Sequence, residues 1–155
     1  MYKLVIILFF LFISCSKNQF EIEKVSSSTQ DIYFDVVEKK LLVSGEYPKY
    51  FTDELEYFFI NRIKSNGIDG ILQIEILEFT EEITDIENGK KINLSLLIDF
   101  LISKENTGYS KKSKINVNEF GSLSGNFSLN EFDEIKKNTV KALFNRLSEE
   151  LNINN

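Results

Sequence analysis

The stretch GILQIEILEFTEEITDIENGKKINLSLLIDFLIS, residues 70–103, decides the fold of this chain. Its second half alternates strictly, because every second residue is apolar: Ile92, Leu94, Leu96, Ile98, Phe100 and Ile102. Successive side chains of a strand point to opposite faces of the sheet, so this pattern predicts a strand with one buried face. Between the two halves stands Asn88-Gly89, a strong signal for a tight hairpin turn. The stretch therefore predicts a long antiparallel hairpin.

The turn sets the expected register of this hairpin. With Asn88-Gly89 as the two central turn residues, Ile83 lies opposite Leu94 and Phe79 lies opposite Ile98. Apolar residues then face apolar residues on one side of the hairpin.

The apolar residues of the first strand change phase from even to odd numbers: Leu72, Ile74 and Ile76, then Leu77, Phe79 and Ile83. A slip of one residue turns every side chain to the other face. A β-bulge at Leu77–Glu78 removes the conflict, and it places Ile76 opposite Phe100 and Ile74 opposite Ile102. The alternative is a strand that is apolar on both faces.

Further strands flank the hairpin. Alternation of apolar and polar residues predicts a third meander strand at Lys111–Glu119, followed by a loop or frayed strand at Phe120–Phe127. Asp31–Ser44 reads as one or two strand pieces with an irregularity near Glu38–Lys40.

Two amphipathic helices complete the domain. The first is expected at about Thr52–Asn66, with a capping box formed by Asp53 and Glu56. Its apolar stripe is Leu55, Phe58, Phe59 and Ile63. The second is expected at about Leu129–Asn152, after a capping box in which Ser128 precedes Glu131 by three residues.

The resulting order is β-α-β-β-β-α. Each helix has one apolar face, and the sheet is apolar mainly on one face, so the elements must pack as two layers. We therefore predict an α+β two-layer sandwich in which an antiparallel meander sheet of about four strands carries both helices on one face.

The N-terminus predicts a lipid anchor. A short basic start precedes ten apolar residues, Leu4–Ile13, and a small residue, Ser14, which is the layout of a secretory signal peptide. Leu11-Phe12-Ile13-Ser14-Cys15 resembles a bacterial lipobox, in which the cysteine thiol carries a diacylglycerol; Phe12 stands where a Leu is commoner. We expect a signal peptide at 1–14, a lipidated N-terminus with a polar tether at 15–30, and a single domain at 31–155.

Composition narrows the function. The chain has no His, one Cys and a formal net charge of −6. Metal sites built on thiolate or imidazole, His-dependent nucleophiles and structural disulfides are thereby excluded. An acidic chain without a clustered basic face is a poor candidate for binding nucleic acid. We predict no catalytic residue, no cofactor and no metal site.

Three sequence features are candidate contact sites. Leu97 and Leu101 lie on the strand face opposite the strict apolar phase and are the partner-binding candidates. Glu78, Glu81, Glu82, Asp85 and Glu87 form an acidic cluster that either binds a divalent cation or forms a solvated hairpin end. Lys111, Lys112 and Lys114 either meet anionic headgroups or protect an edge strand from aggregation.

Residues 63–70, IKSNGIDG, lead into a strand that ends at Glu78, and residues 118–123, NEFGSL, precede the terminal helix. With these two stretches the chain resembles a family of uncharacterised alphaproteobacterial lipoproteins, which has no assigned catalytic residue. More distantly, the lipobox and the order of elements resemble the LPS-assembly lipoprotein, which plugs an outer-membrane barrel, and the auxiliary lipoprotein of ABC-type lipid transporters.

These resemblances imply a non-enzymatic accessory subunit with an envelope protein partner, either an outer-membrane barrel or an ABC transporter. Ser16 follows the cysteine, whereas in enteric bacteria an Asp there retains lipoproteins in the inner membrane, so the outer membrane, facing the periplasm, is expected. The alternative function is a carboxylate-dependent envelope hydrolase with two converging carboxyl groups.

Overall fold

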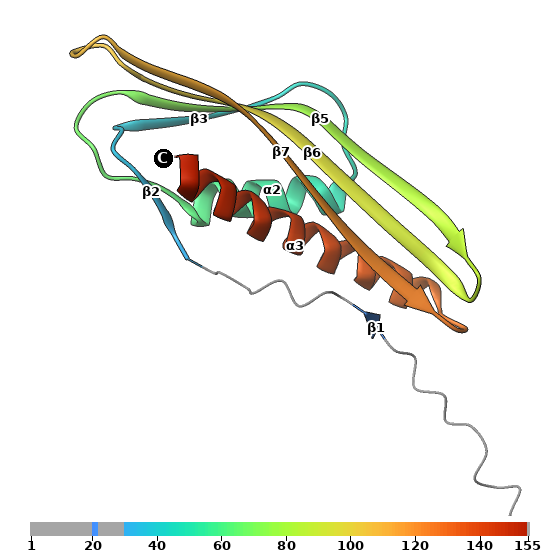
Figure 1. Ribbon diagram of the computed structural model, residues 1–155. Helices are drawn as coiled ribbons and strands as arrows, with labels where there is room; N and C mark the ends of the chain where they lie inside the picture. The colour runs from blue at the N-terminus through green and yellow to red at the C-terminus, as the bar shows by residue number, and fades with distance from the viewer. Residues whose placement is uncertain (1–19, 22–29, 155) are drawn as a thin grey trace, which may run out of the picture.

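A computed structural model describes residues 20–21 and 30–154 of the chain (Figure 1). A five-stranded sheet has the order β1-β7-β6-β5-β3, and both described helices, α2 and α3, lie on one of its faces. A second, two-stranded sheet pairs β2 with β4. The predicted α+β sandwich is confirmed.

Three strands of sixteen residues each form the antiparallel centre of the sheet: β5 (Ile71–Ile86), β6 (Gly89–Lys104) and β7 (Tyr109–Ser124). The ladder between β5 and β6 shifts register between Ile76 and Glu78, and Leu77 is the extra residue. The predicted bulge is therefore confirmed, and the inner face of β6 is buried along its whole even-numbered series from Ile92 to Ile102.

The predicted pairing within the hairpin is wrong by two residues. Ile83 pairs with Ile92 rather than Leu94, and Phe79 pairs with Leu96 rather than Ile98. The same shift applies upstream of the bulge, where Ile76 pairs with Ile98 and Ile74 with Phe100.

Gly89 explains this shift. Ile86 pairs with Gly89, so the two turn residues are Glu87 and Asn88, and Gly89 is the first residue of β6. A Cβ on Gly89 would lie 1.8 Å from the carbonyl oxygen of Leu123 in β7, so the glycine allows close strand approach. A shift of two residues leaves each side chain on its predicted face.

β7 extends through part of the stretch for which the sequence left open a loop or a frayed strand. It includes Phe120–Ser124, and it pairs with β6 without interruption as far as the partner of Gly89. Gly121 lies on the inner face, where a Cβ would come within 2.3 Å of Thr139 Oγ1 in α3. This glycine marks a close helix–sheet contact rather than the end of the strand.

The N-terminal strands make the sheet mixed. β1 (Phe20–Glu21) pairs antiparallel with β7, whereas β3 (Glu38–Val43) pairs parallel with β5. β2 (Ile32–Phe34) pairs parallel with β4 (Ile63–Ser65). The irregularity expected near Glu38–Lys40 is wrong, because the chain breaks between β2 and β3 and those residues lie inside β3.

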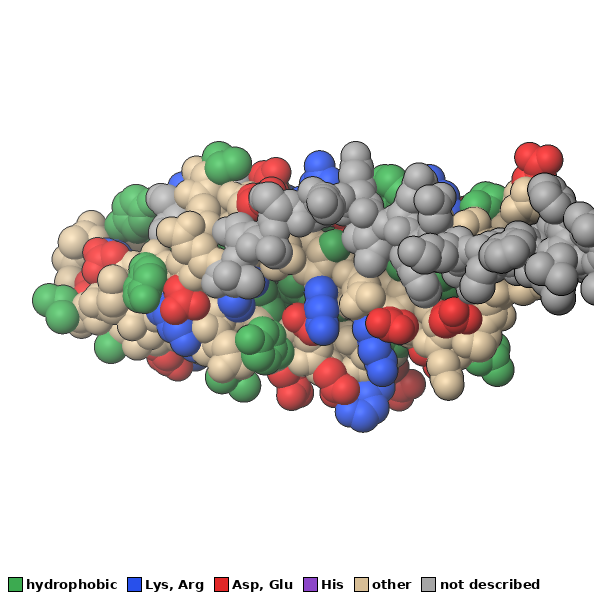
Figure 2. Space-filling model, turned by 90° about the horizontal axis from the view of Figure 1, so that it is seen from below, with side chains coloured by type: hydrophobic (Ala, Val, Ile, Leu, Met, Phe, Trp, Pro, Cys, Tyr) green, Lys and Arg blue, Asp and Glu red, His purple; other side chains and the backbone are tan. Residues whose placement is uncertain are grey.

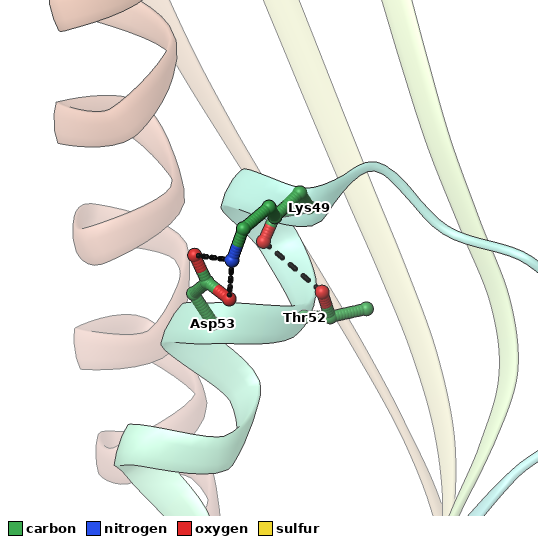
Figure 3. Close-up of polar contacts among 3 residues, drawn as sticks. All are labelled: Lys49, Thr52 and Asp53. Carbon is green, nitrogen blue, oxygen red and sulfur yellow. Dashed lines mark hydrogen bonds and ion pairs between the residues drawn. The ribbon is translucent and has the colours of Figure 1, made fainter.

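α2 (Lys49–Asn61) begins three residues earlier than predicted and ends five residues earlier. Its N-cap is Pro48, without a side-chain cap; the Thr52 hydroxyl instead donates to the Lys49 carbonyl at 3.0 Å. Asp53 accepts a hydrogen bond from Lys49 at 2.8 Å, so the predicted capping box of Asp53 with Glu56 is wrong (Figure 3).

The helix stops at Asn61 because the next residues form β4, so Ile63 is a strand residue and not part of the helical stripe. Lys39 on β3 covers this end of the helix, where its Nζ donates to the carbonyls of Phe59 (2.6 Å) and Ile63 (2.7 Å). A cation is favourable at the C-terminus of a helix.

α3 (Leu129–Asn154) begins where it was predicted. The Ser128 backbone N–H donates to Glu131 Oε2 at 2.6 Å, and the Glu131 backbone N–H donates to Ser128 Oγ at 3.3 Å, so this capping box is confirmed. Its buried stripe packs on the inner sheet face together with the aromatic residues of α2, where the Phe51 ring stacks on Phe79 with centroids 4.0 Å apart.

Candidate functional site

The candidate contact face is the side of the sheet opposite the helices. Leu97 pairs with Glu78 and Asn116, and Leu101 pairs with Gln73 and Lys112. Both leucines are half-buried, and their neighbours across the strands are polar. The structure therefore places them on the predicted face, but as two separate apolar positions.

Charged side chains separate the two leucines. Asp99 lies between them on β6 and has Glu75 and Lys114 as its cross-strand neighbours. Its side chain is 12% exposed, and Lys112 Nζ lies 2.9 Å from Oδ2. Because Asp99 is largely buried and paired with a cation, its carboxylate is held in place between the two leucines. A partner that binds both leucines must therefore complement this charge as well as the apolar side chains.

A shallow hollow of about 280 Å³ continues the same face toward the β5–β6 turn. Two cross-strand rows supply most of its lining, Thr80–Ser95–Asn118 and Glu82–Asn93–Phe120. Hydroxyl, amide and charged groups line most of it, and the one ring, Phe120, has Lys91 Nζ 4.7 Å from its centroid. The hollow offers hydrogen bonds rather than a deep apolar site.

The acidic cluster is divided between the two faces of the hairpin. Glu81 points to the inner face, Glu82 points to the outer face, and Asp85 lies 2.8 Å from Lys90 Nζ. Within residues 30–153, no group of three or more His, Cys, Asp or Glu side chains is placed to hold a metal ion.

Glu81 belongs to a polar cluster that the sequence did not predict. It accepts a hydrogen bond from the Tyr50 hydroxyl of α2, and its Oε1 lies 2.6 Å from Lys136 Nζ of α3. Burial, followed by the hydrogen bond and the negative charge of Glu81, raises the pKa of Tyr50 well above its usual range. A tyrosine held neutral in this way is a hydrogen-bond donor, not a base or nucleophile.

Arg62, at the end of α2, organises the place where the chain enters the domain. Its guanidinium donates to the Gln30 carbonyl through Nη2 at 3.1 Å, to Asn145 Oδ1 at 3.2 Å and to Ser148 Oγ at 3.1 Å. These contacts join Gln30, α2 and α3. They hold in place Gln30, the last residue of the predicted tether.

A hollow of about 520 Å³ lies beside Arg62, between the two helices. Glu54, Tyr57 and Lys141 contribute to its lining. Burial raises the pKa of Glu54, and the charges of Lys141 and Arg62 oppose that rise. With both charge signs present, the hollow favours no single class of charged ligand.

The three lysines of β7 differ in their surroundings. Lys112 and Lys114 are exposed on the outer face, whereas Lys111 is half-buried on the inner side. Bonding to Asp99, followed by the charges of Asp99 and Glu75, raises the pKa of Lys112. Lys112 therefore forms an ion pair within its own sheet, with Asp99 of the neighbouring strand.

Cys15 lies outside the described residues. In the part of the chain that is described, no helix is both long enough and apolar enough to cross a bilayer. Figure 2 shows hydrophobic, basic and acidic side chains interspersed on the uncovered part of one face, without a broad apolar area.

No protein family and no curated protein sequence matches the chain. Similar solved structures include a minor lipoprotein from Acinetobacter baumannii, which is 12% identical over 77% of this chain and 94% of that chain, with a TM-score of 0.44. The rare lipoprotein B from Shewanella oneidensis is 14% identical over 77% and 100%, with a TM-score of 0.40. An uncharacterised lipoprotein B from Nitrosomonas europaea is 9% identical over 80% and 87%, with a TM-score of 0.44.

All three of these proteins are described as lipoproteins. Likenesses this distant establish neither a common family nor a common function, and the resemblance to alphaproteobacterial lipoproteins stays a prediction of the sequence.

Proposed function

We propose that this protein is a lipid-anchored accessory subunit of the bacterial cell envelope, attached through Cys15 and without catalytic activity of its own. The observation that carries the proposal is the lipobox at 11–15, followed by a polar segment and a compact two-layer domain. A tether beside a membrane raises the effective concentration of the domain toward a membrane partner, so modest intrinsic affinity suffices.

We place the protein at the outer membrane, facing the periplasm, and expect its partner to be a barrel or a lipid or LPS transport assembly. Ser16 and the distant resemblances given above support this choice. The described carboxylates give no support to the alternative hydrolase, because the inner-face groups Glu81 and Glu119 each lie beside a cation, Lys136 and Arg146. Such pairs hold elements together.

Replacing Cys15 tests the anchor. In Cys15→Ala the thiol that would carry the diacylglycerol is gone, so we expect either a soluble, unlipidated form or an unprocessed precursor. Membrane fractionation with mass spectrometry of the N-terminus is the measurement. Normal processing of Cys15→Ala together with normal membrane retention of this variant would refute the proposal. If the wild-type protein fractionates with the inner membrane alone, the outer-membrane assignment is wrong.

The double variant Leu97→Asp with Leu101→Asp tests the contact face. Both side chains are half-buried on the outer face, so adding charge should abolish co-purification of the partner from envelope membranes, while circular dichroism and melting stay close to wild type. The matched control is Asn106→Asp with Thr107→Asp, which adds the same charge to exposed positions in the turn between β6 and β7, away from the two leucines. If the leucine variant folds and still binds, the contact lies elsewhere, and the exposed side of α3 is the next candidate.

A further inference from the structure

β1 ties the N-terminal segment to one end of β7. Phe20 is in register with Leu123 and Glu21 with Ser122, near the C-terminal end of β7 (Figure 1). Because the two strands are antiparallel, Phe20 lies nearer to that end than Glu21 does. Cys15 precedes Phe20 by five residues, and five residues span at most about 18 Å. A lipid on Cys15 would therefore hold this end of the sheet close to the membrane surface.

The opposite end of the sheet is far from that attachment. β7 runs fourteen residues from Leu123 back to Tyr109, which corresponds to roughly 45 Å of strand at 3.3 Å per residue. The β6–β7 turn at residues 105–108 lies at this distant end. The two ends of the sheet thus differ in their access to the bilayer.

Large apolar side chains are exposed at the attached end. Leu129, the first residue of α3, is 83% exposed, and Ile86, at the end of β5, is 42% exposed. The Gly125 backbone N–H donates to the Asn88 carbonyl at 2.7 Å, which joins the loop before α3 to the β5–β6 turn. Exposed aliphatic side chains near a lipid anchor are suited to the bilayer interface.

Charge at this end is of both signs, with the exposed Glu87 in the β5–β6 turn and Glu131 in the first turn of α3 on the acidic side. Asp85 is paired with Lys90 at 2.8 Å, and Lys91 lies over the Phe120 ring. We propose that the end formed by the β5–β6 turn and the start of α3 faces the phospholipid bilayer, with Leu129 and Ile86 in contact with it, and that the β6–β7 turn points away. The inference rests on the proposed lipid anchor at Cys15.

The single cysteine of the chain makes a direct test possible. Once its thiol carries the lipid, a cysteine introduced elsewhere is the only free thiol. We would label lipidated Leu129→Cys and, as the matched control, Asn106→Cys in the β6–β7 turn, with an environment-sensitive dye. Each is then reconstituted in phosphatidylcholine vesicles that contain a nitroxide-labelled lipid. We expect blue-shifted emission and several-fold stronger quenching at residue 129 than at residue 106.

A second pair of variants tests the contribution of β1. Glu21→Pro removes a backbone N–H and disfavours the pairing with Ser122, whereas Glu21→Ala keeps the backbone unchanged. Strong quenching at residue 129 should weaken in the proline variant and persist in the alanine variant.

Several outcomes would overturn the orientation. These are equal quenching at both labels, stronger quenching at residue 106, or quenching at residue 129 that the proline variant leaves unchanged. A label at residue 129 that is unquenched in vesicles but protected in native membranes would assign this end to a protein partner instead. Failure of the lipid-modified fraction to float with vesicles would count against the anchor itself, and so against the proposed function.

Discussion

Tyr50 is a single side chain that ties three elements together. It lies on α2, donates to Glu81 on β5, and has Lys136 Nζ of α3 5.7 Å from its ring centroid. Burial first, and Glu81 second, keep the phenol protonated. In the unfolded chain Tyr50 is neither buried nor close to Glu81, so its pKa is higher in the folded state than in the unfolded state.

This difference predicts how stability depends on pH. The contribution of Tyr50 is fully present below pH 10, the usual pKa of tyrosine, and is lost as the pH rises through 10 toward the folded pKa, because the unfolded chain releases its proton first. In Tyr50→Phe we expect a loss of about 1 kcal/mol in unfolding free energy at pH 7, from the missing hydrogen bond. Above pH 10 the difference in unfolding free energy between Tyr50→Phe and wild type should become smaller. Urea denaturation between about pH 7 and about pH 11.5 measures this difference.

Tyr57→Phe is the matched control. Tyr57 lies on the same helix and is more than half exposed. Removal of its hydroxyl should therefore leave the unfolding free energy with the same dependence on pH as in wild type. A constant gap between Tyr50→Phe and wild type across this pH range would contradict the role given to Tyr50.

At the scale of the element, β7 and α3 approach each other closely at Gly121. A Cβ there would lie 2.3 Å from Thr139 Oγ1 and 3.0 Å from Ile135 Cγ1. The Thr139 hydroxyl already donates to the Ile135 carbonyl at 2.7 Å, which fixes its position. Helix and sheet therefore leave no space at this position for a side chain.

Gly121→Ala should destabilise the domain by about 1–3 kcal/mol, the usual cost of overpacking. Adding Thr139→Ala removes the first atom that the new methyl group meets, so the double variant should recover part of the loss. Ser122→Ala, one residue along the strand and on the outer face, is the control. Thermal melts of wild type, Gly121→Ala, Thr139→Ala, the double variant and the Ser122→Ala control test the coupling; simple additivity of the two changes would contradict close contact at this position.

Local signals predicted the elements that depend on local contacts. The start of α3 was predicted correctly because the reciprocal bonds of Ser128 and Glu131 lie within one helical turn. The end of α2 was not, because pairing of Ile63 with Ile32 in another part of the chain forms β4 there. At Gly121 the sequence left a loop or a frayed strand open, whereas the missing side chain serves packing against α3.

At the scale of the whole molecule, sequence patterns predicted the layers but not the order of the strands. The β5–β6–β7 meander follows from adjacent alternating segments, whereas the parallel pair of β3 with β5 is separated in sequence by α2. No periodicity in one sequence specifies such a long-range pair. β1 was also missed, because a strand of two residues is too short to show an alternating pattern.

The candidate contact face was predicted in part. Leu97 and Leu101 were assigned to the correct side of the sheet, because the two-residue error in register preserves the face of every residue. The half-buried Asp99 between them, and the cluster of Tyr50, Glu81 and Lys136, depend on tertiary contacts and left no signal in the sequence.

The bulge at Leu77 also determines where this chain tolerates a change of length. Upstream of residue 77 the core residues of β5 have even numbers, and downstream they have odd numbers. Deleting residue 77 itself would leave every other side chain on its present face and join the two halves into one regular ladder. A deletion elsewhere in β5 would turn over all the side chains between its own position and residue 77, so its cost should grow with that distance. The shortened strand would keep its core and lose only the additional twist that a bulge introduces.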